Sequence, residues 1–199
     1  MASRPFLLER VPARFLWKCR FLHVRPTRFA LVANVQRQAV SLFVRTPPAS
    51  TSHLRPGAGW SHPVSYSCCR WYLASTSRFG VGQQSGSNRT PLGLHRVAEK
   101  VGAGQIPGTV FETRRPVGLT WQGHPDAPIA HRILWLEGLE PGFNQGGEVD
   151  SRARFIYIHG LANEPSLGRP SSRGCIHLAA ADLVPLFDRI PVGTLVWIE

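Results

Sequence analysis

Two short stretches decide the fold and the chemistry of this chain: Tyr157-Ile158-His159-Gly160 and Ser171-Ser172-Arg173-Gly174-Cys175-Ile176-His177. The first ends an apolar strand on a histidine, and the second places a thiol on a turn next to glycine. A free cysteine has a pKa near about 8.5, so little of it is thiolate at neutral pH, and a neighbouring imidazole activates it by accepting the proton. The pair therefore predicts a cysteine acyl-transfer enzyme.

The length of the chain and its cysteines limit which fold classes are possible. The chain has 199 residues, which suffices for one ordinary domain and an extension. Its four cysteines have no CxxC pair and no regular spacing, which argues against a disulfide framework or a Cys-rich zinc site. No apolar run approaches the roughly eighteen residues that cross a bilayer, so no transmembrane span is expected. The four cysteines are Cys19, Cys68, Cys69 and Cys175.

The net charge of +11 is distributed unevenly. Residues 1–100 carry 15 Lys and Arg against 2 acidic residues, whereas residues 101–199 carry 8 against 10. The half that bears Cys175 is therefore close to neutral. A basic arm alone supplies only non-specific affinity for phosphates, so nucleic-acid binding is not expected as the main function.

Residues 1–28 are rich in Arg and contain a single acidic residue. This pattern is typical of an organelle presequence or a membrane-surface helix, and a wrongly chosen start codon would explain it equally well. The apolar run at 29–33 is shorter than a secretory signal requires. We expect residues 1–28 to be a basic, disordered extension before a domain at 29–199. Four apolar residues of the extension fall roughly on one helical face: Leu7, Val11, Phe15 and Leu22.

The rest of the chain consists of many short β-like runs between Gly and Pro clusters, which predicts a mainly β domain. Residues 46–69, rich in Pro and Ser, are predicted to be a loop insertion, and residues 80–87, rich in Gly, Ser and Gln, a mobile loop. The expected strands lie within residues 29–44 (two strands), 70–76, 94–100, 110–111, 133–136, 155–158 and 194–198.

One segment, Ala180 to Arg189, is predicted to be a helix. Its apolar residues are spaced i, i+3, i+4, i+7 and so share one face. Pro185 would be tolerated if the helix begins near Ala181 or Asp182, because the first four N–H groups of a helix have no partner within it. The apolar face consists of Leu183, Leu186, Phe187 and Ile190.

Cys175 and His159 are the candidate nucleophile and base. The N–H groups of Gly174 and Cys175 are candidates to hold an oxyanion. The carbonyl of Gly160 is a candidate to orient the imidazole, with the carboxylate of Glu164 as the alternative. Non-catalytic roles stay open at this point: Cys175 could be a small buried apolar residue, and His159 could be a structural residue.

Three polar residues flank the nucleophile and are the candidate substrate-binding residues. Arg173 and His177 lie two positions before and after Cys175, and Ser172 precedes Arg173. Arg173 is either a surface charge or a partner for a substrate carboxylate. A zinc site made by His159, Cys175 and His177 is a further alternative, although its spacing fits no common ligand pattern.

At these residues the chain resembles the L,D-transpeptidase catalytic domain (the YkuD-type domain) of bacteria. The similar segments are IYIHG, the LG-x-P that follows it, S-x-G-C-I and the ending LF-x-x-I-P-x-G-T, together with TPLG, VAEKVGAG and ILWLEGLEPGFNQGG-x-VD upstream. The similarity runs from about Val35 to Glu199. It implies a β-sandwich or barrel catalytic fold with one or two short helices.

The resemblance also implies a reaction. Cys175, with His159 as its base, would attack the carbonyl of the third residue of a peptidoglycan stem peptide and expel the terminal D-alanine. Transfer of the thioester to an amine would give a cross-link, and transfer to water would give L,D-carboxypeptidase action. The reaction implies no cofactor and no metal. The first hypothesis is the transpeptidase, which transfers the thioester to an amine, and the second is a cytoplasmic L,D-carboxypeptidase that recycles wall peptides. The absence of a clear secretory signal favours a cytoplasmic location, with the cell envelope as the alternative.

Two positions depart from the family pattern. The position before Gly174 is usually His and is Arg173 here, and the position after Ile176 is usually Arg or Asn and is His177 here. One cation and one imidazole are thus kept but exchanged. The exchange leaves a third hypothesis, an inactive binder of wall peptides or nucleic acid. Oligomeric state is not predicted.

Overall fold

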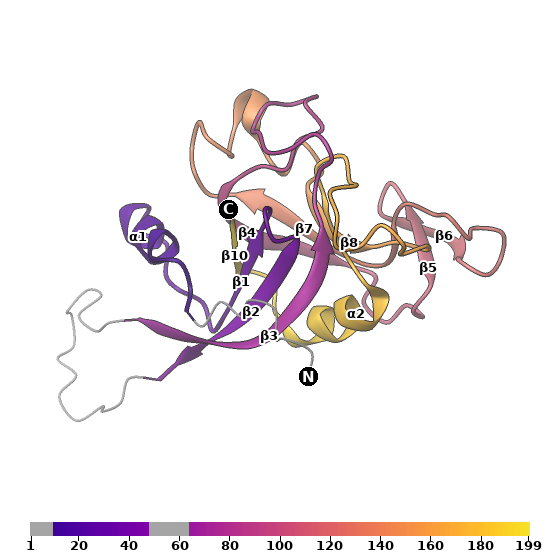
Figure 1. Ribbon diagram of the computed structural model, residues 1–199, viewed down its shortest axis with the longest axis horizontal. Coiled ribbons are helices and arrows are strands. Elements are labelled where there is room, and N and C mark those ends of the chain that lie inside the picture. The colour runs from indigo at the N-terminus through magenta and orange to yellow at the C-terminus, as the bar shows by residue number, and fades with distance from the viewer. Residues whose placement is uncertain (1–9, 48–63) are drawn as a thin grey trace.

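The structure is a computed structural model that describes residues 10–47 and 64–199 (Figure 1). These residues include the helices α1 (Ala13–Phe21) and α2 (Ala180–Arg189) and the 3-10 turn η1 (Gly147–Val149). The strands are β1 (Phe29–Asn34), β2 (Ala39–Thr46), β3 (Ser65–Ser75), β4 (Gly93–Val101), β5 (Thr109–Glu112), β6 (Arg115–Leu119), β7 (Ala130–Gly138), β8 (Tyr157–Gly160), β9 (Ile176–Leu178) and β10 (Leu195–Ile198).

The strands form one sheet that closes on itself. Their order is β4-β10-β1-β2-β3-β9-β8-β7-β5-β6, and an additional pairing of β4 with β7 joins the first strand to the eighth. The hairpin of β5 and β6 extends from β7 at the end of the molecule opposite α1 (Figure 1). Two pairs, β1–β10 and β8–β9, are parallel. The prediction of a mainly β barrel with few helices is therefore confirmed.

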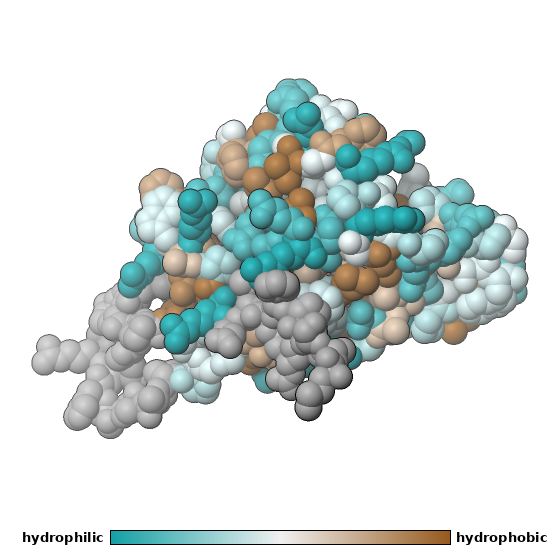
Figure 2. All heavy atoms as spheres, in the orientation of Figure 1, coloured by the Kyte–Doolittle hydropathy of each residue, from teal (hydrophilic) through white to brown (hydrophobic). Residues whose placement is uncertain are grey.

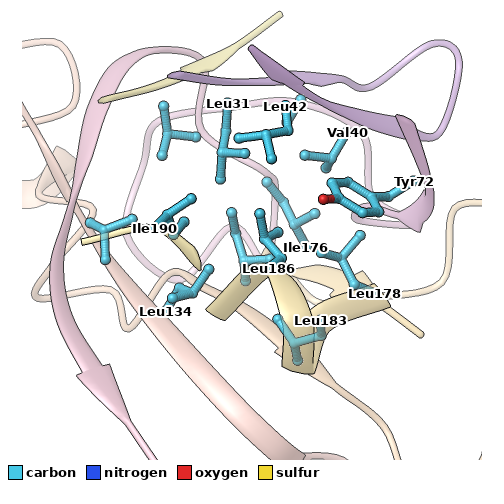
Figure 3. Close-up of a cluster of buried hydrophobic side chains, with 14 of the residues drawn as sticks. Leu31, Val40, Leu42, Tyr72, Leu134, Ile176, Leu178, Leu183, Leu186 and Ile190 are labelled. Atoms are coloured by element: carbon cyan, nitrogen blue, oxygen red, sulfur yellow. The ribbon is translucent and has the colours of Figure 1, made fainter. Parts of the chain in front are cut away.

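Helix α2 packs one face on the barrel core and leaves its other face exposed. Its Leu183, Leu186 and Phe187 are at most 1 % exposed and belong to the main core cluster. Figure 3 shows Leu183 and Leu186 facing the strand residues Leu31 and Leu42 across this core. The predicted helix is confirmed over the whole range Ala180–Arg189. The helix begins at Ala180, one residue before the start at Ala181 or Asp182 that would have left the N–H position of Pro185 without a partner in any case. The proline therefore lies in the helix interior and removes one backbone hydrogen bond there.

Strand β1 is buried on both faces, which explains its continuous apolar sequence. Leu31 and Ala33 face the barrel core, whereas Ala30 and Val32 face a second cluster outside the barrel. Phe15 and Cys19 of α1 complete that second cluster, and both are fully buried. Helix α1 thus covers the outer face of the barrel.

The packing of α1 corrects the prediction of a disordered extension at residues 1–28. Residues 13–21 are helical, and full burial of a phenylalanine side chain such as Phe15 contributes about 1.5–3 kcal/mol. The helix is ordered because the outer face of β1 needs an apolar cover. Residues 1–9 lie outside the described residues.

The predicted loop insertion at residues 46–69 is also too long. Strand β2 extends to Thr46, and β3 begins at Ser65 and pairs with it in antiparallel register. Residues 48–63 lie outside the described residues. None of the helices in the described ranges has the length and apolarity needed to cross a bilayer.

Candidate active site

The two sequence stretches quoted first lie side by side on the sheet. Strands β8 and β9 are parallel neighbours, with Ile158 opposite Ile176 and His159 opposite His177. Ile158 and Ile176 point into the barrel core. Because side chains alternate along a strand, His159 and His177 lie on the outer face of the sheet, and Cys175, directly before β9, lies on the same face.

His159 is held in a single orientation by its neighbour. Its side chain is 3 % exposed, and its Nδ1 lies 2.9 Å from the carbonyl oxygen of Gly160. A carbonyl can only accept a hydrogen bond, so Nδ1 carries the proton and Nε2 is left as the basic nitrogen. Gly160 therefore orients the ring as predicted from the sequence. The carboxylate of Glu164 has another role, because it accepts a hydrogen bond of 2.6 Å from the N–H of Ala180 at the start of α2.

Cys175 is partly exposed at the edge of a small apolar cluster. It packs against Phe111, Ile133 and Tyr157. Its Sγ accepts a hydrogen bond of 3.4 Å from the N–H of Tyr157 and donates one of 3.4 Å to the carbonyl of Phe155. The thiol is therefore held at a defined position by the backbone of the chain that leads into β8.

Burial keeps both the Cys175 thiol and the His159 imidazole neutral at pH 7. It raises the pKa of the Cys175 thiol to about 11, although the Tyr157 N–H and the positive charge of Arg154 act in the opposite direction. Burial also lowers the pKa of His159 to about 4, against the effect of its bond to Gly160. A thiol and a neutral imidazole are thus the stable forms at pH 7, and proton transfer has to accompany attack on a substrate.

The turn before Cys175 is shaped by Gly174 and Ser172. Gly174 has φ +121°, and a Cβ there would lie 3.3 Å from the carbonyl oxygen of Arg89. The hydroxyl of Ser172 accepts a hydrogen bond of 3.1 Å from the Gly174 N–H and donates one of 2.6 Å to the Cys175 carbonyl. The Gly174 N–H is therefore occupied, which corrects its assignment as an oxyanion donor. Ser172 is 2 % exposed and supports the turn, so the structure does not favour its prediction as a substrate-binding residue.

The other two flanking residues differ in their surroundings. Arg173 is exposed, and among the described residues no carboxylate forms an ion pair with it. The ring of His177 lies 4.8 Å from that of His159, centre to centre, and its buried Nδ1 has no hydrogen-bond partner in the described part of the chain. Burial, and then the neighbouring His159, lower the pKa of His177 to about 3.

Arg154 is a site residue that the sequence analysis missed. Its guanidinium donates hydrogen bonds to the carbonyls of Gly82 (3.2 Å), Gln83 (2.7 Å) and Arg89 (2.7 Å). It thereby holds the loop that packs against Gly174, while its charge acts on the Cys175 thiol. Residues 80–87, called the glycine loop from here on, were predicted to be mobile, but the Arg154 guanidinium anchors them through its hydrogen bonds. One Arg in a chain with many gives no sequence signal of such a role.

A second group of missed residues forms a wall beside the thiol. Phe155 is 51 % exposed and has φ +55°, a left-handed conformation that is rare for a phenylalanine. The guanidinium of Arg114 lies 5.4 Å from its ring centre and 4.4 Å from that of Trp135, and it donates a hydrogen bond of 3.3 Å to the Tyr157 hydroxyl. The site is thus bordered by aromatic rings and a cation.

The zinc alternative finds no support in this geometry. Across residues 10–47 and 64–199, no three His, Cys, Asp or Glu side chains are grouped so that they could hold a metal ion. His159, Cys175 and His177 instead present one thiol and two neutral imidazoles on one sheet face. A neutral imidazole is able to accept a proton from a thiol, which leaves the sulfur as a nucleophilic thiolate.

Comparisons with known proteins agree with these observations. Residues 69–198 match the YkuD family, the L,D-transpeptidase catalytic domain. The "Putative L,D-transpeptidase YqjB" of Bacillus subtilis (strain 168) is 40% identical over 76 residues, which are 38% of this chain and 38% of that protein. The chain therefore matches well under two thirds of that relative's length.

One solved structure shows the same fold at low sequence identity, and others are similar to a lesser degree. Bd1075 of Bdellovibrio bacteriovorus is similar with a TM-score of 0.52 and 15% identity, over 87% of this chain and 48% of that chain. L,D-transpeptidase 3 from Mycobacterium tuberculosis, in complex with a faropenem-derived adduct, has a TM-score of 0.45 and 16% identity, over 86% of this chain and 60% of that chain. At such identities the likeness concerns the fold alone.

Proposed function

The chain belongs to the L,D-transpeptidase catalytic domain family, and from this premise we propose that it is a cysteine acyltransferase acting on peptidoglycan stem peptides. Cys175 is the nucleophile, and His159 is its general base. The observation that carries the proposal is the hydrogen bond from His159 Nδ1 to the Gly160 carbonyl, which leaves Nε2 basic on the sheet face that also bears Cys175.

The first half-reaction forms a thioester. The Cys175 Sγ–H proton passes to His159 Nε2 while Sγ bonds to the carbonyl carbon of the third stem residue. The C–N bond to the terminal D-alanine then breaks, and the proton on His159 goes to the departing amine. The low pKa of His159 makes its imidazolium a strong acid, which favours this second proton transfer.

The oxyanion of the tetrahedral intermediate needs at least one fixed donor. We assign this role to the Cys175 N–H, since the Gly174 N–H already donates to Ser172. Ser172 and Gly174 act as positioning residues that set the direction of that N–H. This assignment replaces the two-donor arrangement expected from the sequence.

The cations near the thiol support an acidic substrate. Arg173 is exposed beside Cys175 and has a free charge for a substrate carboxylate, and Arg114 borders the same region. His177 lies against His159, where an Arg or Asn is usual in the family, and its position supports a role in holding the base. We assign substrate binding to Arg173 and contact with the base to His177.

The second half-reaction decides between two products. An acceptor amine that reaches the thioester gives a cross-linked dimer, and water gives a tripeptide. Mass spectrometry of products from a tetrapeptide stem, alone and with an acceptor stem, separates transpeptidase from L,D-carboxypeptidase activity. Either product supports the proposed first half-reaction.

The control variant is Cys175→Ser, which keeps the size of the side chain and removes the thiol. We expect it to abolish release of D-alanine, and unchanged release would refute the assignment. An inactive binder, the remaining alternative, would release no D-alanine and would form no carbapenem adduct on Cys175.

A further inference from the structure

Helix α1 presents a second, unexplained surface. Its inner face is buried on the barrel through Phe15 and Cys19. Its outer face carries Trp17 and Phe21, which are 58% and 64% exposed although both are large apolar side chains. Their rings are stacked at 5.3 Å and 15°. Two large aromatic side chains that are exposed to solvent side by side indicate a surface that binds a partner.

The charged residues of α1 and its flanks all have one sign. Residues 10–28 contain six Arg and Lys and no Asp or Glu. Lys18 is neutralised by its ion pair with Glu140 at 2.6 Å, but the other five cations are exposed. Helix α1 and the residues beside it thus carry positive charge and no carboxylate of their own, and Arg14 lines the same part of the surface as the aromatic pair. The five exposed cations are Arg10, Arg14, Arg20, Arg25 and Arg28.

An apolar groove continues the same surface toward the barrel. It has a volume of about 970 Å³ and lies between α1 and the ends of the neighbouring strands. The carboxylates in its wall are already occupied: Glu140 by Lys18, and Glu199 by the Trp197 indole N–H at 3.0 Å. Its apolar lining includes Trp17, Phe21, Leu22, Leu92, Phe143 and Trp197. In Figure 2 the surface over α1 alternates between hydrophilic and paler or brown atoms.

We propose that α1 docks this protein on the surface of an anionic phospholipid bilayer. Exposed cations next to Trp and Phe side chains are the combination that interfacial helices use, because the cations meet lipid phosphates and the rings enter the headgroup region. Double-stranded DNA would meet the cations through its phosphates and would leave the apolar groove unused, because its bases are stacked inside the duplex. Both the charge and the apolar lining therefore favour a lipid surface.

The docking face is preorganised. Phe15 and Cys19 anchor α1 to the barrel before any contact with lipid, so binding orders no new helix. Because Trp17 and Phe21 are mainly exposed, their replacement leaves this anchor intact. The proposal concerns a surface separate from Cys175 and does not depend on the reaction assigned to it.

The test is co-sedimentation of the full chain with vesicles of phosphatidylglycerol and phosphatidylcholine, against vesicles of phosphatidylcholine alone. We expect binding to the anionic vesicles that falls as salt is raised. Trp17→Ala/Phe21→Ala should weaken it about tenfold or more. Arg14→Gln should weaken it about fivefold, the effect of one surface cation.

Matched controls come from the β5–β6 end of the molecule, where Trp121 is 63% exposed and Arg115 is exposed. Trp121→Ala and Arg115→Gln should bind as the wild type does. Circular dichroism of each variant verifies that the fold is kept. Failure to bind anionic vesicles, or equal binding by the Trp17→Ala/Phe21→Ala variant, overturns the proposal. The proposal is also overturned if the wild type is a dimer in solution and the Trp17→Ala/Phe21→Ala variant is a monomer. It is likewise overturned if the wild type binds DNA but not vesicles, and the variant binds DNA equally well.

Discussion

Replacement of Arg154 by methionine tests whether one cation holds the glycine loop and tunes the thiol. The guanidinium makes three hydrogen bonds to loop carbonyls, those of Gly82, Gln83 and Arg89. Hydrogen bonds from a charged donor are worth about 1.5–3 kcal/mol each. Since Arg154 is half-buried and water replaces part of its contacts, we expect a loss of about 2–4 kcal/mol in the stability of the closed loop.

Hydrogen exchange measures the loop directly. The N–H of Gly82 donates to Thr90, that of Thr90 to Gly80, and that of Ser85 to Glu148. A loss of 2 kcal/mol in the closed state makes exchange of these amides about 30-fold faster. Loss of the positive charge also raises the pKa of Cys175, so the pH midpoint of its alkylation moves upward.

Arg152→Met is the matched control, two residues away. Arg152 forms an ion pair of 3.3 Å with Glu99 between partly exposed side chains, which is worth at most about 1 kcal/mol. It should change neither readout. Arg154→Lys should keep the pH midpoint of Cys175 alkylation near that of the wild type, because lysine keeps the positive charge. It should still speed hydrogen exchange of the loop amides, because an ammonium lacks the forked set of donors of a guanidinium. The reasoning is refuted if Arg154→Met exchanges and titrates as Arg152→Met does.

Further predictions concern stability and the turn. Phe15→Ala should lower the free energy of unfolding by about 3–5 kcal/mol in urea, and a loss below about 1 kcal/mol would mean that α1 is not part of the folded unit. Gly174→Ala should lower kcat while the fold is kept, because its Cβ meets the loop backbone; Gly193→Ala, also at positive φ but in open space, should retain kcat, and equal activity of both variants would contradict this. Stability should fall as the pH drops from 6.5 toward 4, by up to about 1.4 kcal/mol per pH unit for each of three histidines, because the unfolded chain binds protons that the native state does not. Urea midpoints from pH 7 to 4.5 test this, and constant or rising midpoints on acidification would contradict it. The histidines concerned, with pKa values of about 4, 4 and 3, are the buried His95 and His159 and the half-buried His177.

Local patterns sufficed to predict most of the barrel strands, although β6 and the three-residue β9 were not expected. The continuous apolar run of β1 predicts burial on both faces, and the alternation of β8 predicts which side chains lie on each face of the sheet, since successive residues of a strand point to opposite faces. The same parity places His159 and Cys175 on one face once β8 and β9 pair. The bond from His159 to Gly160 was predictable because it joins sequence neighbours.

The missed features depend on contacts between distant segments. Helix α1 is short, and although Phe15 was seen to lie on an apolar helical face, the outer face of the barrel that orders this helix cannot be read from the local sequence. Arg154 acquires its role only when the loop at 82–89 folds against it. Phe155 was expected within a strand, and its positive φ arises where the preceding turn brings its carbonyl toward Cys175.

The most direct test of the central claim is the intact mass of the enzyme during turnover of a tetrapeptide stem. We expect an adduct equal in mass to the tetrapeptide minus D-alanine, bound as a thioester on the peptide that contains Cys175. The adduct should be absent in Cys175→Ser, and free D-alanine should appear only with the wild type. Release of D-alanine by the serine variant at the wild-type rate, or an adduct on another residue, would contradict the account.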